Sequence, residues 1–288
     1  MNDIFDFKRF GLVIEKDIQE RSKHYLLLFV LMLGVIAVVS TLITYTYFYS
    51  PVQLNEMELL ELNNRLIIVI LIFFAVLGCI IASTIMEPMN SKVKKISFLS
   101  FPASDFEKFL SRWLIVTVGY VLLFIIAVFV ADALRVGFCS LIFTRSPIPW
   151  IDWTFIAGHN DTVYYSSFVF SEVYYLHLAF SIFLFSQSLY VLGATFWPRF
   201  SFIKTYFAKQ VLGVLFLVFC YIAIVVSYDK IDDFFNVLDY LQASSPDLRL
   251  VQTKSIVSAV SAVLYGSTIL NWGLAFMRFK ESEIINRF

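Results

Sequence analysis

The chain has 288 residues, of which 59% are hydrophobic, 18% aromatic and 15% charged, and its formal net charge is zero. A soluble domain is closer to half apolar and a quarter charged, so this composition indicates a protein that lies in lipid. The neutral charge balance gives no support for a nucleic-acid partner, and the three cysteines form no CxxC pair, which disfavours a zinc site or a disulfide framework.

The first 24 residues predict an amphipathic helix that lies in the membrane interface. Phe7, Phe10, Ile14 and Ile18 recur at three- and four-residue steps, with charged residues such as Arg9 between them. The segment is too rich in acids for a cleavable signal peptide, so the first apolar run is expected to stay in the membrane. This helix is either a general membrane anchor or a docking element, and the pattern leaves both open.

Six apolar runs are long enough to cross a membrane, because about 20 helical residues cover about 30 Å of hydrocarbon. The runs are Tyr25–Tyr47, Leu66–Met86, Trp113–Ala131, Val173–Pro198, Gln210–Tyr228 and Ser255–Met277. They do not alternate as the strands of a membrane barrel do. The predicted fold is therefore an all-α polytopic membrane protein, with a six-span domain over 25–277 and a tail over 278–288.

The basic residues predict the orientation. Sixteen Lys and Arg residues fall on the N-terminus, the second-to-third and fourth-to-fifth connections and the tail, whereas six fall on the other connections. The positive-inside rule therefore places both termini in the cytosol, and Trp113 and Trp197 suit the cytosolic headgroup layer. These features predict a multi-pass protein of the cytoplasmic membrane.

Two connections on the predicted outer side are long. The first contains Pro147–Trp150 and Trp153 and is apolar enough to lie on the membrane surface. In the second, apolar residues between 231 and 241 have helical spacing, which predicts a short amphipathic helix.

The longest predicted cytosolic connection, residues 87–112, contains a helix start. Pro102 would break a helix that arrives from the second span. Ser104 and Glu107 have the spacing of a capping box, in which each side chain satisfies a free amide at the helix start. A new helix should therefore begin near Ser104 and run into the third span. By itself, this pattern is an ordinary helix start between two spans.

The segment Phe101–Phe109 resembles the second-to-third loop of the permease subunits of ABC type-2 exporters, especially small bacterial ones. Those loops often read Leu-Pro-Ala-Ser followed two residues later by Glu-Lys, and here Phe101 replaces the usual leucine. The six spans, inside termini, interfacial N-terminal helix and long outer loop before the last span are also similar to that family. The local motif covers this short segment, whereas the architecture covers the whole chain.

The resemblance implies a permease subunit of an ATP-driven exporter in the bacterial inner membrane. Two permeases, identical or homologous, would pair to form the path, and each would rest on a separate ABC ATP-binding subunit that carries ATP and Mg. The coupling helix would comprise Pro102, Ala103, Ser104, Asp105, Phe106, Glu107 and Lys108, with Glu107 meeting the ATPase. The N-terminal helix, with Phe7, Arg9, Phe10 and Ile14, would act as a second connecting element.

The chain itself is expected to be neither an enzyme nor a cofactor binder. Its ten glycines form no Gly-x-x-x-x-Gly-Lys-Ser/Thr phosphate loop, so the motor would be a separate polypeptide. His177, in the fourth span, lies five residues after Glu172, but a metal site would need at least one more ligand nearby, which favours a satisfied or interfacial histidine over a metal ligand. Gln187 and Asn271 are the polar residues deepest in the spans. Such amides either join helices, which is favoured, or line a substrate path.

Two other classes of function stay open. A non-transporting assembly or sensor component would show the same six spans, but no ATPase would co-purify with it. A secondary transporter ranks third, because the spans hold no titrating carboxylate. The aromatic, uncharged spans favour an amphiphilic or hydrophobic cargo, although packing against lipid explains the aromatic residues equally well.

Overall fold

The computed structural model describes residues 5–49, 54–143, 147–153, 173–226 and 246–285, and the regular structure over these ranges is entirely helical. Within them, six helices are long and apolar enough to cross a membrane. The predicted all-α, six-span architecture is therefore confirmed, and the chain is a multi-pass membrane protein. The side of the membrane on which the termini lie stays a prediction.

The spans lie in helices that are mostly longer than the apolar runs. In chain order they are α1 (Phe7–Phe48), α2 (Glu56–Ala82), the continuous helix α4–η2–α5 (Asp105–Leu114, Ile115–Gly119 and Tyr120–Ile142), α6 (Val173–Phe196), α7 (Ser201–Val226) and α9 (Pro246–Ile285). Between α2 and α4 the chain forms the 3-10 turn η1 (Glu87–Asn90) and the short helix α3 (Lys92–Leu99).

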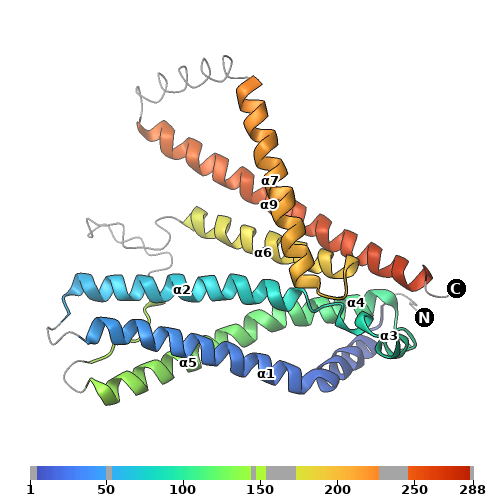
Figure 1. Cartoon of the computed structure of the whole chain (residues 1–288), viewed down its shortest axis with the longest axis horizontal. Coiled ribbons are helices and arrows are strands. Elements are labelled where there is room, and N and C mark those ends of the chain that lie inside the picture. Colours follow the sequence, from blue (N-terminus) through green and yellow to red (C-terminus); the bar gives the residue numbers. More distant parts are fainter. Residues whose placement is uncertain (1–4, 50–53, 144–146, 154–172, 227–245, 286–288) are drawn as a thin grey trace.

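The predicted interfacial helix and the predicted first span form one helix of 42 residues, α1. No proline or glycine lies between Ile18 and Tyr25, so nothing interrupts the backbone hydrogen bonds at the expected boundary. Figure 1 shows that the first part of α1 is bent relative to the remainder. The helix that contains the third span likewise extends beyond the predicted apolar run, from Asp105 to Ile142.

Two groups of helices build the bundle. In the first, α1 packs along α5 with α2 beside them; in the second, α6 packs along α9. Figure 1 shows α7 diverging from the rest, and most of its side chains between residues 206 and 222 are exposed. The groups meet where Phe74, Tyr120 and Phe183 stack, and the Tyr120 hydroxyl donates a hydrogen bond to the Phe74 carbonyl at 2.6 Å.

The described part of the first long connection packs on the bundle. Ile148 and Ile151 are buried, and the side chain of Asn63 in α2 hydrogen-bonds the backbone of Asp152. These residues therefore lie against the helices instead of resting only on a membrane surface. The amphipathic helix predicted between 231 and 241 lies outside the described residues.

A glycine sets the contact between α6 and α7. A Cβ on Gly193 would lie 2.0 Å from the Thr205 Oγ1 atom and 2.9 Å from the Thr205 Cβ atom. We expect Gly193→Ala to destabilise the protein by about 1–3 kcal/mol, because the two helices must move apart. Thermal unfolding in detergent measures this change. Gly213→Ala is the control, because a Cβ there meets nothing within 4 Å. Equal stability of both variants would contradict close packing of α6 on α7.

Candidate functional site

The first turns of α1 and α4 lie side by side, although about a hundred residues of sequence separate them. They meet at the end of the bundle that also holds α3 and the α6–α7 connection. We call this end the basic end, because the segments there hold most of the lysines and arginines. Two ion pairs join the helices, one of them buried and the other partly buried, and we call this contact the α1–α4 joint.

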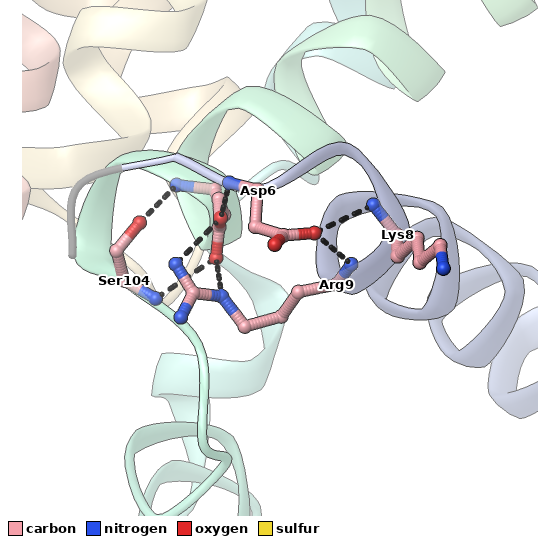
Figure 2. Close-up of polar contacts among 5 residues, drawn as sticks. Asp6, Lys8, Arg9 and Ser104 are labelled. Carbon is pink, nitrogen blue, oxygen red and sulfur yellow. Dashed lines mark hydrogen bonds and ion pairs between the residues drawn. The ribbon is translucent and has the colours of Figure 1, made fainter. Parts of the chain in front are cut away.

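Glu107 is the centre of the first half of the joint. Its carboxylate accepts hydrogen bonds from the Arg9 guanidinium at 2.7 and 2.8 Å, from the Asp6 amide at 2.8 Å and from the Ser104 amide at 3.1 Å. Figure 2 shows Asp6, Arg9 and Ser104 around this carboxylate. Asp6 in turn caps α1, because its side chain accepts from the amides of Lys8 and Arg9. One carboxylate therefore holds two helix starts together.

The protonation of Glu107 follows from these contacts. Its side chain is completely buried, which by itself would raise its pKa. The hydrogen bonds from Arg9 and from the amides of Asp6 and Ser104 outweigh that burial and lower the pKa of Glu107 to about 2. The positive ends of two helix dipoles favour the same charged form. Glu107 is therefore a carboxylate throughout the physiological pH range, and it precedes the apolar run that starts at Trp113.

Asp17 and Arg112 form the second half of the joint. Arg112 Nη2 lies 3.1 Å from Asp17 Oδ1, and the hydroxyl of Ser111 donates to Asp17 Oδ2 at 2.9 Å. Both charged side chains are at least 94% buried. The Arg112 guanidinium also lies 4.4 Å from the centre of the Phe98 ring, so it connects α1 and α4 to α3. A buried pair with this many partners fixes one arrangement of the helices, because loss of either partner leaves an unpaired charge.

Aromatic residues of α9 support the other side of α4. Phe109 packs against Phe276 and Phe279, and Trp113 meets Trp272 edge-to-face with ring centroids 4.9 Å apart. The basic end thus holds α4 between α1 and α9. A displacement of α4 would therefore move both neighbours.

The structure confirms the predicted helix start. The capping box of Ser104 and Glu107 is present, and α4 begins at Asp105 and continues into the third span. Pro102 and Ala103 lie in the bend before the helix, Asp105 and Phe106 begin it, and Lys108 is buried beside Glu107. The Glu107 side chain lies inside the protein and is bonded to Arg9, and the expected contact of this residue with an ATP-binding subunit stays a prediction.

The exposed element of this connection is α3, which the sequence analysis did not predict. Val93 is 80% exposed and Ile96 66% exposed, with Lys94 between them. Ser91 caps the helix by accepting a hydrogen bond from the Lys94 amide. A serine followed by eight residues without proline or glycine was a signal for this helix in the sequence.

The predicted connecting helix presents its apolar residues outward. Phe7 is 83% and Ile18 46% exposed, and Phe10 and Ile14 are partly buried. The face that packs on α4 is a different one, in which Val13 and Asp17 are buried. An acid at helical spacing from buried apolar residues was the signal in the sequence that Asp17 has a buried partner.

Gln187 and Asn271 both hydrogen-bond to neighbouring helices. The Gln187 amide donates to the Val116 carbonyl at 3.2 Å, and the Asn271 amide donates to the Ser188 hydroxyl at 3.0 Å. These donors support the helix-joining role, while the Gln187 carbonyl oxygen is buried and has no partner among the described residues. Val116 lies in η2, a π-helical turn that links α4 to α5.

A buried charge pair at the opposite end of the bundle was also missed. Arg135 is fully buried and contacts the Asp132 carboxylate at 2.7 Å, Thr44 Oγ1 at 3.2 Å and the Pro149 carbonyl at 2.7 Å. Asp132 also accepts from the Ile151 amide. The pair ties the connection after α5 to α1. The side chain of His177, at the same end, is exposed.

Comparison with protein-family models, with curated proteins and with solved structures finds no match for this chain. The fold and the site therefore define a class, a six-span helical membrane protein with the α1–α4 joint at its basic end. Assignment to a particular transporter family is a matter for proposal.

The joint gives a mutational prediction. Glu107→Gln removes the charge that holds Arg9 and the two helix starts, so we expect a loss of about 2 kcal/mol in unfolding free energy. Chemical or thermal unfolding in detergent measures the loss. Glu61→Gln is the matched control, because its ion pair with Arg65 at 2.6 Å is more than half exposed and should contribute nothing measurable. Equal effects of both variants would contradict a special role for Glu107.

The lowered pKa of Glu107 gives a pH dependence. A carboxyl group whose pKa falls on folding stabilises the folded state fully above its ordinary pKa, here 4.5, and loses that effect as the pH falls toward 2. We therefore expect hydrogen-exchange protection factors at the start of α1 to be constant from pH 8 to pH 5 and to fall below about pH 4. In Glu107→Gln this pH step should disappear. A step that persists in that variant would assign it to another group.

Proposed function

We propose that this chain is the membrane permease subunit of an ATP-driven exporter, that it works as a dimer, and that a separate ATP-binding subunit drives it from the cytosol. The α1–α4 joint is the observation that carries the proposal. It links an N-terminal helix with an exposed apolar face to a helix that continues through the turn η2 into a membrane span. Such a connection can transmit a displacement from outside the bilayer into the bundle.

The part of the basic end best suited to meet the ATP-binding subunit is α3. Its exposed Val93 and Ile96 offer apolar contact area on both sides of Lys94. Phe98, on the opposite face of α3, is buried and stacks on Arg112 of the joint. A push on α3 would therefore reach the joint through that contact. In this proposal α3, in place of Glu107, contacts the ATP-binding subunit. Glu107 instead holds α1 and α4 together, so that a displacement of α3 reaches both helices.

The π-helical turn η2 is the point at which a displacement of α4 can change direction before it reaches α5. A π-helical turn interrupts the regular backbone hydrogen bonds and is frequent at functional sites in helices. Here it lies between α4, which belongs to the joint, and α5, which belongs to the bundle. Gln187 of α6 donates a hydrogen bond to the carbonyl of Val116 within this turn. A displacement of the turn would therefore also move α6.

The experiment that tests the proposal is co-purification. The chain is co-expressed with the ATP-binding subunit encoded beside its gene, and the complex and its ATP hydrolysis are measured. We expect Val93→Glu to abolish the complex, because it places a carboxylate in an apolar contact. Val93→Ile should preserve the complex, because it keeps the surface apolar. Binding that is equally strong in both variants would remove α3 from the interface.

A second outcome distinguishes the alternative function. If no ATP-binding subunit co-purifies while the protein still associates with itself, the chain is a non-transporting assembly or sensor component. The ion pairs Arg9–Glu107 and Asp17–Arg112 would then serve stability alone. Glu107→Gln would lower the unfolding free energy and change no ATPase activity.

A further inference from the structure

A pocket with a volume of about 620 Å³ lies at the basic end, between the η1–α3 segment and the α6–α7 connection. Its lining combines three basic side chains with aromatic and aliphatic ones. Among the lining residues are Lys95, Arg199, Lys204, Ile96, Phe196 and Trp197. None of the lining residues that the structure describes is acidic.

The three basic residues have no acidic partner among the residues that the structure describes. The acids of the neighbouring elements are already paired: Glu87 contacts Arg21 at 3.0 Å and Lys94 at 3.8 Å, and Glu281 contacts Arg278 at 3.0 Å. Arg199 donates a hydrogen bond to the Asn90 carbonyl at 3.1 Å, which fixes its position. The pocket therefore carries uncompensated positive charge, which suits a phosphate.

Apolar side chains surround this charge. Ile96 is 66% and Phe196 52% exposed, and the Trp197 ring is partly exposed next to Arg199. Tryptophan next to basic residues is typical of the headgroup layer of a membrane, where an indole contacts both lipid chains and water. A free phosphate ion would use only the charges, whereas a phospholipid would use both the charges and the apolar rim.

The pocket also contains a buried acceptor without a donor. The Asn90 side-chain oxygen has no hydrogen-bond partner among the described residues, and Asn90 lines the pocket. A headgroup that carries a hydroxyl next to its phosphate could donate a hydrogen bond to this oxygen. That bond would remove the free-energy cost of a buried acceptor without a partner.

We propose that this pocket binds one anionic phospholipid, with the phosphate held by Lys95, Arg199 and Lys204, a headgroup hydroxyl donated to Asn90, and the acyl chains leaving past Phe196 and Trp197. The bound lipid joins the η1–α3 segment to the α6–α7 connection, which the hydrogen bond from Arg199 to the Asn90 carbonyl also links. The proposal stands apart from the exporter function and holds for either class of protein discussed above.

Native mass spectrometry of the purified full chain, titrated with phosphatidylglycerol or phosphatidylcholine, tests this site. We expect one phosphatidylglycerol to bind each chain more tightly than the lipids that follow. The variant K95Q/R199Q/K204Q should weaken that first binding about a hundredfold, because each basic residue near an anionic lipid contributes about fivefold. The variant K95Q/K204Q, which keeps the Arg199 contact to Asn90, should weaken it about 25-fold and guards against a folding defect in the triple variant.

The matched control is K8Q/K23Q/K280Q, which removes three exposed charges from other parts of the same end. It should keep the tight site. Equal weakening in the control and the pocket variant would overturn the proposal, because binding would then follow net charge alone. Inorganic phosphate that competes with phosphatidylglycerol at equal concentration would also overturn it, since the site would then recognise the free ion. A loss of ATP-binding-subunit association without any loss of lipid would assign the pocket to a protein partner instead.

Discussion

One carboxylate, that of Glu107, determines how the N-terminal segment relates to the membrane bundle. Four donors from three residues converge on it, and two of them are amides at the starts of helices. A helix start leaves amide groups unsatisfied, so it is a place where a single negative charge can organise several elements at once. Without that charge, the starts of α1 and α4 would lose their direct link, and the Asp17–Arg112 pair would have to join the two helices. With it, they form one rigid corner from which the first and third spans leave.

The bundle combines this rigid corner with a loosely packed side. The helices α1, α2, α4 and α5 share buried polar and aromatic contacts at both ends, through Arg112 and through Arg135. By contrast, most side chains of α7 between residues 206 and 222 are exposed, and α7 diverges from the other helices in Figure 1. In lipid, packing and polar contacts between helices replace the hydrophobic driving force, so the tightly bonded group is the stable platform. A helix exposed on nearly all sides is free to contact acyl chains or a second copy of the chain, in keeping with the proposed dimer.

Features that depend on neighbours in the sequence were predictable, and those that depend on distant partners were not. The six spans follow from length and hydropathy, and the capping box follows from two residues three positions apart. The pairing of Arg9 with Glu107 joins residues 98 positions apart, and no local pattern encodes such a distance. The interior position of Glu107 could not be predicted for the same reason, because its partner Arg9 on α1 is distant in the sequence. Asp17, Asp132 and Arg135 could have been found, because each is a charge at helical spacing from apolar residues.

The π-helical turn at Ile115–Gly119 has a geometric consequence for the helix that contains it. Each residue of an α-helix turns the chain by about 100°, and a π turn accommodates one residue more than an α turn does. The side of α4 that carries Arg112 is thereby offset by about one residue's rotation from the side of α5 that carries Tyr120. A single continuous rod can thus hold the N-terminal segment with one face and the second span with another. Removal of one residue from this turn would rotate the face of α4 that carries Arg112 relative to the face of α5 that carries Tyr120. Either the N-terminal segment or the second span would then lose its contact with this helix.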